Sequence, residues 1–120
     1  MLPLQLEGCS VPAALGQRPL LAPDRARGLA SLFRLLANDS RLRLLHALAR
    51  AGELSVTALA QRVGMKPQAV SNQLQRLSDL GVLASRRAGN HIFYRLTDCC
   101  VPLLLEFGLC VLEQHQTPSR

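Results

Sequence analysis

Apolar side chains recur every three or four residues along much of the chain, and this spacing predicts amphipathic helices. Residues that cap helices stand before three of these stretches: Asp24 before the first, Asp39 before the second, and Thr97 or Asp98 before the last. Together these signals predict helices over residues 24–37, 39–50, 54–63, 67–80 and 99–114. The chain is therefore expected to be mainly helical.

The stretch between the fourth and fifth predicted helices follows a different pattern. Gly81 ends the fourth helix, and residues 82–87 and 91–96 are predicted strands joined by a short turn. A short helix that ends at Gly64, a longer helix and a basic hairpin form the outline of a winged helix-turn-helix, which reads DNA. The sequence thus predicts a mainly α fold with a small β-hairpin (α+β), a winged helix-turn-helix.

One domain of modest size accounts for most of the 120 residues. Residues 1–22 carry three prolines and two glycines and are expected to form a flexible N-terminal arm. Residues 23–116 are expected to form the sensor and DNA-binding domain, and residues 117–120 a disordered tail. No apolar stretch approaches the roughly 18 residues that span a membrane, and the N-terminus lacks the basic start of a signal peptide. We therefore expect a cytoplasmic protein with no membrane partner.

The charge balance of the chain indicates which class of partner it binds. Lys and Arg number 14 against 8 Asp and Glu, which gives a formal net charge of +6 and a pI near 10.1. Such a balance favours a polyanionic partner such as nucleic acid. Four cysteines without a secretion signal indicate reduced thiols rather than a disulfide framework.

The predicted helix over residues 67–80 has two unlike faces. Its core-facing positions are Val70, Leu74, Leu77 and Leu80. Its opposite face is polar and almost uncharged, and consists of Gln68, Ser71, Asn72 and Gln75. Asn and Gln side chains can bond adenine bidentately in the major groove, so this face is expected to read double-stranded operator DNA. The alternative is an ordinary solvated face.

Positive charge gathers around this helix and the hairpin. Between residues 62 and 95, 6 Lys and Arg residues stand against a single acid, Asp79. They could contact about six phosphates, and the hairpin tip could lie along the backbone or enter the minor groove. Strands at a sheet edge also carry such charges for solubility. The predicted DNA-contacting residues are Lys66, Gln68, Ser71, Asn72, Gln75, Arg76, Arg86, Arg87 and His91.

The last helix carries a broad apolar face. The face consists of Val101, Leu104, Leu105, Gly108, Val111 and Leu112. On a terminal helix of so small a domain, such a face indicates burial against a second chain, and the glycine permits close approach. We therefore expect a homodimer, which also suits two half-sites on DNA.

The thiols of the last helix also call for a second chain. Cys99 and Cys110 are 11 residues apart, which places them about 16 Å apart along one helix. One metal ion with bonds of about 2.3 Å cannot join them within a chain. Antiparallel pairing of two such helices would bring Cys99 of one chain near Cys110 of the other. The alternative is that the cysteines are small apolar residues in a dimer interface.

With these features, residues 28–114 resemble the ArsR/SmtB family of dimeric winged-helix repressors. The resemblance rests on three stretches: 36–45 (Leu-Ala-Asn-Asp-Ser-Arg-Leu-Arg-Leu-Leu), 69–74 (Ala-Val-Ser-Asn-Gln-Leu) and 92–96 (Ile-Phe-Tyr-Arg-Leu). It implies dimerisation through the first and last helices, promoter binding in the inducer-free state, and release when a metal, metalloid or reactive species binds. By the family's pattern, Gln68, Ser71 and Asn72 match recognition-helix contact positions.

Zinc-sensing members of the family carry Asp-x-His-x10-His-x2-Glu or His on the last helix, and this chain resembles that pattern in two frames. One frame matches Cys99, Cys110 and Glu113. The other matches Asp98 and Cys100 but leaves a valine at the second His position. Both frames stay open at this point.

Thiols in place of imidazoles favour a thiophilic inducer, with no organic cofactor. The candidates are arsenite, cadmium, lead, zinc and copper(I). Arsenite would take three thiolates, from Cys99 and Cys100 of one chain and Cys110 of the other. A divalent ion could add Glu113 or Asp98. Cys9 could complete a four-thiol site or remain an unliganded thiol.

Two alternatives share the predicted fold. The chain could sense oxidants or persulfides through a disulfide from Cys99 or Cys100 to Cys110, or it could be a winged-helix protein-interaction module. An enzyme is not expected, because the sequence holds no Cys-x-x-Cys, no Gly-rich phosphate loop and no nucleophile placed with both His and acid. His46 is expected to be a partly buried structural histidine rather than a ligand.

Overall fold

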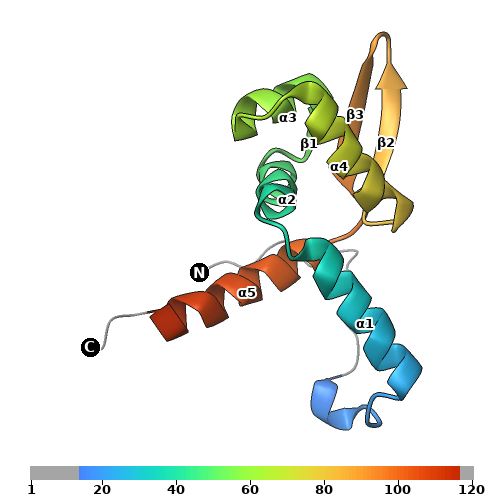
Figure 1. The fold of residues 1–120 in the computed structure, drawn as a ribbon, viewed down its shortest axis with the longest axis vertical. Helices are drawn as coiled ribbons and strands as arrows, with labels where there is room; N and C mark the ends of the chain where they lie inside the picture. Colours follow the sequence, from blue (N-terminus) through green and yellow to red (C-terminus); the bar gives the residue numbers. More distant parts are fainter. Residues whose placement is uncertain (1–13, 117–120) are drawn as a thin grey trace.

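The computed structural model of the chain describes residues 14–116. Within them, five α-helices, one 3₁₀-helix and three strands follow one another (Figure 1). In chain order they are η1 (Leu15–Gln17), α1 (Pro23–Leu36), α2 (Asp39–Ala51), β1 (Glu53–Ser55), α3 (Val56–Val63), α4 (Pro67–Asp79), β2 (Leu83–Ala88), β3 (His91–Leu96) and α5 (Cys100–Gln116). Figure 1 shows α2, α3 and α4 beside the sheet, while α1 and α5 project away from that group. The predicted winged helix-turn-helix is confirmed.

Two helices begin differently from the sequence prediction. Pro23 is the first residue of α1, where a missing backbone donor costs least, so Asp24 lies inside the first turn. The cap of α2 is Asn38, whose Oδ1 accepts a hydrogen bond from the backbone nitrogen of Arg41 at 3.0 Å. Asp39 is therefore the first helical residue. The prediction that Asp24 and Asp39 cap these helices was therefore wrong, although both lie near the positive end of a helix dipole.

The sheet has one strand more than the predicted hairpin. β1 pairs antiparallel with β3, with Leu54 opposite Tyr94, and the strand order is β1-β3-β2. The sequence prediction of a helix from Leu54 was wrong at its start, because Ser55 caps α3 by accepting a hydrogen bond from the Ala58 nitrogen at 3.1 Å. A three-residue strand is too short to show a period, and its partner lies far along the chain.

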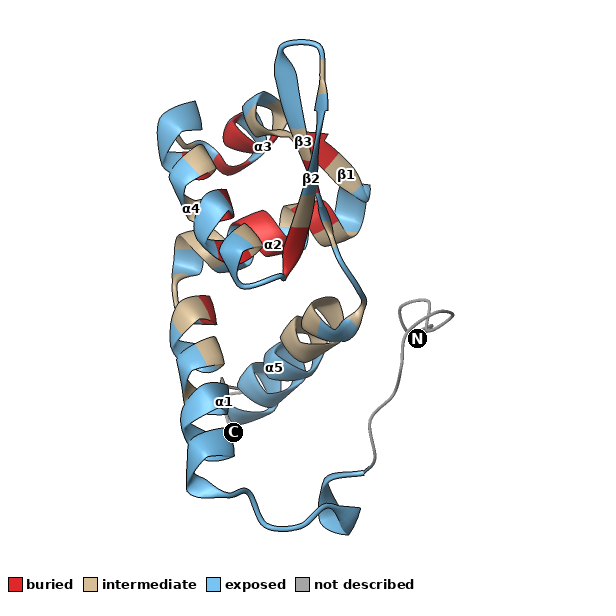
Figure 2. Ribbon diagram, turned by 90° about the vertical axis from the view of Figure 1, so that its right-hand side faces the viewer, coloured by how far each residue is buried: buried red, intermediate tan, exposed pale blue. Residues whose placement is uncertain are grey.

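The hydrophobic core lies between α2, α3, α4 and the sheet (Figure 2). Its fully buried side chains are Leu44, Leu45, Leu48, Leu59, Val70, Leu74 and Leu77. The predicted inward stripe of α4 is thereby confirmed except at Leu80, which is 52% exposed because the helix ends at Asp79. Leu42 of α2 is also exposed. The core thus holds α2, α3 and α4 and leaves most of α1 and α5 outside it.

The half-buried guanidinium of Arg41 connects three helices. From α2, its Nε donates a hydrogen bond to Oε1 of Gln73 on α4 at 2.6 Å. Its Nη1 donates to the backbone carbonyl of Leu35 at the end of α1, also at 2.6 Å. Hydrogen bonds from a charged donor are stronger than neutral ones. Arg41 therefore fixes the orientation of α4 relative to α1.

We expect Arg41→Met to lower the free energy of unfolding by about 1.5–3 kcal/mol, the range for hydrogen bonds to a charged group. The methionine keeps much of the aliphatic volume but leaves the Leu35 carbonyl and the Gln73 amide without their donor. Urea unfolding at a fixed chain concentration measures the change. The matched control is Arg34→Met, because Arg34 is exposed and its guanidinium bonds only to Ser31. Equal effects of the two substitutions would contradict this role for Arg41.

Candidate functional site

The outer face of α4 carries ordered amide side chains. Val70, Leu74 and Leu77 anchor the helix in the core, so Gln68, Asn72 and Gln75 point outward and are exposed, with Ser71 half-buried. Gln68 Nε2 donates to Asn72 Oδ1 at 3.1 Å, and Gln75 Nε2 donates to Asp79 Oδ1 at 3.0 Å. These bonds join residues four apart on one helical face. They hold a row of amides in a defined orientation, with the Asn72 amide nitrogen still able to donate outward.

Basic side chains flank this row. Lys66 is the N-cap residue of α4, Arg76 lies in its last turn, and both are exposed. Arg87 and His91 are exposed near the hairpin turn, where Gly89 has a φ of 63° that favours glycine. Exposed basic groups therefore lie at both ends of α4 and near the turn of the β2–β3 hairpin.

Unlike Arg87 and His91, Arg86 of the β2–β3 hairpin (the wing, residues 83–96) is engaged in an ion pair. Its Nε and Nη2 donate to the two carboxylate oxygens of Glu53 on β1, at 2.9 and 2.8 Å. Its guanidinium carbon also lies 4.7 Å from the centre of the Phe93 ring, a cation–π contact. Local sequence patterns do not reveal this bidentate pair, because the pair depends on β1 and β2 lying on either side of β3. Arg86 thus joins the two outer strands of the sheet.

The pair shifts the pKa of both its members. The hydrogen bond from Arg86 is the main cause that lowers the pKa of the Glu53 carboxyl, and the positive charges of Arg86 and Arg95 add to it against the effect of burial. The same bond raises the pKa of Arg86 above its ordinary value. Glu53 therefore stays ionised down to more acidic pH, and Arg86 stays charged up to more alkaline pH, than either side chain would without its partner.

The start of α5 is fixed by Asp98, one of the two predicted caps. Asp98 Oδ1 accepts a hydrogen bond from the Cys100 backbone nitrogen at 2.9 Å. Thr97, the other candidate, instead donates its hydroxyl to the Gly81 carbonyl at 2.9 Å and so secures the end of β3. Asp98 is therefore already engaged by the backbone of the helix that carries the thiols.

The thiols of α5 differ in state and exposure. Cys100 and Cys110 are free and exposed, and Cys110 Sγ accepts a weak hydrogen bond from Gln114 Nε2 at 3.7 Å. Cys99 is half-buried and disulfide-bonded in this structure, so the expectation of reduced thiols does not hold for it. Cys9 lies outside the described residues.

A single chain does not gather the predicted ligands. Within residues 14–116, no three His, Cys, Asp or Glu side chains lie close enough together to hold a metal ion. The helical rise separates Cys100 from Cys110 by about 15 Å, and the exposed Glu113 lies a turn beyond Cys110. The donor types suit a thiophilic ion, but the described residues of one chain bring together only part of a coordination sphere.

An apolar groove runs between α1, α2 and α5. Its volume is about 1040 Å³, and its walls include Phe33 of α1, Leu42 of α2 and Phe107 of α5. Val111 and Leu112 of the predicted apolar face are 59% and 46% exposed in the single chain, and Phe107, outside that face, is 65% exposed. Val101, Leu104 and Leu105 of the same face pack partly against the core of their own chain. His46 also lines the groove and is exposed, so its prediction as a partly buried residue was wrong. Apolar surface of this extent marks an interaction site.

We expect the Glu53 carboxyl to titrate below its ordinary pKa of about 4.5 in an NMR pH titration, and Arg86→Ala to raise that pKa. Because the folded-state pKa is depressed, the stabilising contribution of the pair is present above the ordinary pKa and is lost as pH falls through the lowered value. Arg87→Ala is the control, since it removes a charge from the same strand without touching Glu53. An unchanged Glu53 pKa in Arg86→Ala would contradict the pairing.

Comparisons with known proteins agree with this architecture. A family model described as a helix-turn-helix domain matches residues 36–86. The HTH-type transcriptional regulator NmtR of Mycobacterium tuberculosis is 44% identical over 86 residues, which cover 72% of this chain and 71% of that protein. A cadmium resistance transcriptional regulatory protein, a CadC homolog of Staphylococcus aureus, is 30% identical over 99 residues, 82% of this chain and 80% of that protein.

Solved structures show the same fold. The crystal structure of the AntR antimony-specific transcriptional repressor is 56% identical, covers 90% of this chain and 97% of its own, and superposes with a TM-score of 0.76. A homodimeric winged helix-turn-helix DNA-binding domain of Mycobacterium bovis, a possible ArsR-family regulator, is 31% identical, covers 85% of this chain and 100% of its own, and has a TM-score of 0.64.

The fold, the exposed amide row and these similarities lead to one assignment. Among the described helices, none combines the length and apolar character needed to cross a bilayer. The relatives are DNA-binding regulators rather than enzymes. The chain belongs to the ArsR/SmtB family of winged helix-turn-helix metalloregulatory transcriptional repressors.

Proposed function

We propose that this repressor is a homodimer that leaves its operator when a trivalent metalloid binds thiols contributed by the α5 helices of both protomers. The observation that carries the proposal is the position of the two free thiols. Cys100 and Cys110 are exposed on one helix, too far apart to share an ion, and α5 also lines an exposed apolar groove. A second copy of the chain would cover the groove and would supply its Cys110 to the thiols at the start of the first copy's α5.

The apolar groove supports a second copy of the chain as its occupant. Its walls come from α1, α2 and α5, the elements least covered by the core, and the homodimeric relative from M. bovis has the same fold. Antiparallel packing of two α5 helices places the N-terminal thiols of one helix beside Cys110 of the other. By symmetry, two equivalent sites arise in each dimer.

The donor set favours a trivalent metalloid over the other thiophilic candidates. Arsenite or antimonite would take three thiolates, which Cys99 and Cys100 of one protomer and Cys110 of the other would supply once Cys99 is reduced. Asp98 is engaged as the helix cap, whereas Glu106 and Glu113 lie about one turn on either side of Cys110 on α5 and could add an oxygen ligand for a divalent ion. The similarity to an antimony-specific repressor supports the same choice, and the CadC homolog keeps cadmium as the next candidate.

For DNA, we assign base reading to the outer face of α4 and phosphate contacts to the residues around it. Gln68, Asn72 and Gln75 present exposed amides, and Ser71 adds a half-buried hydroxyl. The phosphate-contacting residues would be Lys66, Arg76, Arg87 and His91, with Arg86 acting through its pair with Glu53 to hold the wing. This division follows the general rule that base edges give specificity and phosphates give position.

The route from α5 to α4 runs through α2. The N-terminal half of α5 packs against the core through Leu104 and Leu105, and Arg41 of α2 binds both the end of α1 and Gln73 of α4. A shift of the dimer helices would therefore change the orientation of the recognition helix. Binding at α5 and binding to DNA are then coupled, each weakening the other by the same factor.

We expect mixed dimers to show that the thiol site spans two chains. Neither Cys110→Ser nor the double variant Cys99→Ser/Cys100→Ser should release the chain's own upstream DNA at antimonite concentrations that release the wild type. Mixing the two variants under reducing conditions creates heterodimers with one complete site, so release should return. Fluorescence anisotropy of the labelled duplex measures it, and both variants should bind DNA normally without antimonite.

Other outcomes of this experiment are equally informative. Failure of the mixture to respond, although heterodimers form, would exclude a shared site. Release by antimonite in every variant would exclude the α5 thiols altogether. Release by mild oxidant, with a crosslink from Cys99 or Cys100 to Cys110 between chains and no metalloid retained, would instead support redox sensing.

We expect Asn72→Ala to weaken operator binding by roughly 1–3 kcal/mol, or about 5- to 150-fold, and to relax preference at one base pair. The cause is the loss of an outward amide that α4 holds in position. Gln61→Ala is the matched control, because Gln61 is an exposed amide on α3 outside the amide row of α4. If Asn72→Ala and the wild type bind operator and random duplexes with equal affinities, the assignment of base reading to α4 is contradicted.

A further inference from the structure

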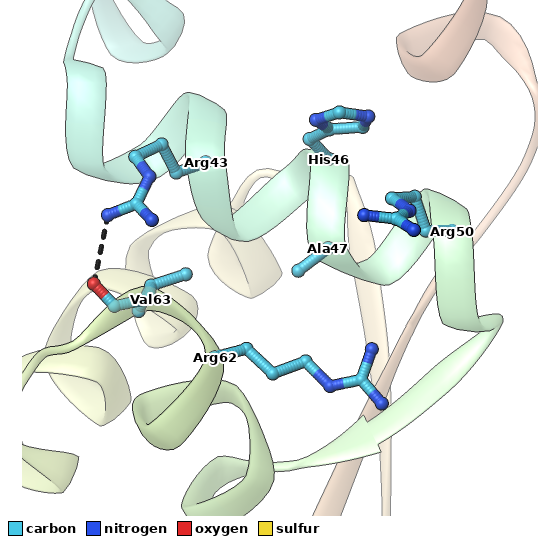
Figure 3. A pocket seen from close by; sticks show the side chains of 6 residues that line it. All are labelled: Arg43, His46, Ala47, Arg50, Arg62 and Val63. Atoms are coloured by element: carbon cyan, nitrogen blue, oxygen red, sulfur yellow. Dashed lines mark hydrogen bonds between the residues drawn. The ribbon is translucent and has the colours of Figure 1, made fainter.

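A small basic hollow lies between α2 and α3, away from the thiols. Its volume is about 170 Å³, and its lining consists of Arg43, His46, Ala47, Arg50, Arg62 and Val63 (Figure 3). Three of these six residues are arginines, one is a histidine, and none is acidic. The hollow is therefore a place where positive charge converges around a space rather than along an extended surface.

One arginine of the hollow has a fixed position. Arg43 Nη1 donates a hydrogen bond to the Val63 carbonyl at 2.9 Å, drawn as the dashed line in Figure 3. That carbonyl belongs to the last residue of α3, where the helix dipole favours a cation. The bond leaves the remaining N–H groups of the guanidinium able to bind a further acceptor.

The other two arginines reach the hollow from different helices. Arg50 comes from α2, and Figure 3 shows the Arg62 side chain of α3 extending past Ala47 toward the side where Arg50 lies. Within residues 14–116, no carboxylate pairs with either guanidinium, since the ion pair found there joins Arg86 to Glu53. Like charges brought together in this way are stabilised when an anion lies between them.

We propose that this hollow binds a phosphate group. Arginine suits this ligand because its planar fork of N–H groups matches two phosphate oxygens, and His46 can add one more donor. Val63 directly precedes the Gly64 turn that leads to the recognition helix, so a bound phosphate lies close to the helix-turn-helix. The phosphate can come from the DNA backbone or from a free phosphate ion.

The test compares two double variants of the full chain that remove equal charge. Arg50→Ala/Arg62→Ala removes two arginines from the hollow, and Arg25→Ala/Arg27→Ala removes two exposed arginines from α1. Arg43 is left in place because its bond to Val63 holds α2 against α3. Circular dichroism establishes that both variants keep the wild-type fold.

Two measurements distinguish the sources of phosphate. Thermal unfolding in inorganic phosphate, against chloride at equal ionic strength, reports binding of the free ion through the rise in Tm. The slope of log affinity against log salt, for the chain's own upstream duplex, reports backbone contacts at about 0.9 per phosphate. We expect Arg50→Ala/Arg62→Ala, and not Arg25→Ala/Arg27→Ala, to lose the Tm rise in phosphate, or to lose about one unit of the salt-dependence slope.

A lost Tm rise would assign the hollow to free phosphate, and a lost slope unit would assign it to the DNA backbone. If both variants behave alike in both measurements, the proposal is overturned, and the arginines act only through overall charge. The result does not depend on the thiols, because neither variant alters α5 and no metalloid is present. Because Arg50 also lines the apolar groove, analytical ultracentrifugation must show that both variants keep the oligomeric state of the wild type.

Discussion

The guanidinium of Arg41 is the contact on which the relative orientation of α1, α2 and α4 depends. It donates to the end of α1 and to Gln73 of α4 while its own backbone nitrogen donates to the α2 cap at Asn38. One residue thus sets the relation between a helix outside the core and the helix that presents the amide row. An arginine supplies donors on three nitrogens in a fixed plane, and Arg41 uses two of these nitrogens, Nε and Nη1, for its two partners.

Around this contact the chain is divided between two tasks. The core between α2, α3, α4 and the sheet is buried enough to hold the recognition helix in place. α1 and the C-terminal half of α5 remain largely exposed, with apolar side chains that water solvates poorly. This arrangement suits a regulator, because a second chain and a ligand can rearrange the exposed helices without unfolding the core that holds α4.

Electrostatics divides the positive charge into groups with different partners. Arg86 is neutralised by Glu53 and serves the sheet, whereas Arg87 and His91 remain exposed near the wing turn. Arg50 and Arg62 converge on a hollow behind the helix-turn-helix. The basic residues behind the net charge of +6 therefore do not form one uniform surface. Some of them hold the fold together, and others are exposed and can contact a phosphate.

The sequence by itself determined what depends on local order along the chain. The inward stripe of α4, the turn at Gly64, the hairpin and the apolar face of α5 all follow from periods and glycines that neighbouring residues define. Tertiary structure decided what depends on residues far apart: the short strand β1, the Glu53–Arg86 pair, the bonds of Arg41 and the basic hollow of α2 and α3. It also placed Leu42, His46 and Leu80 outside the core, because burial is set by which elements pack against a helix face and not by the face alone.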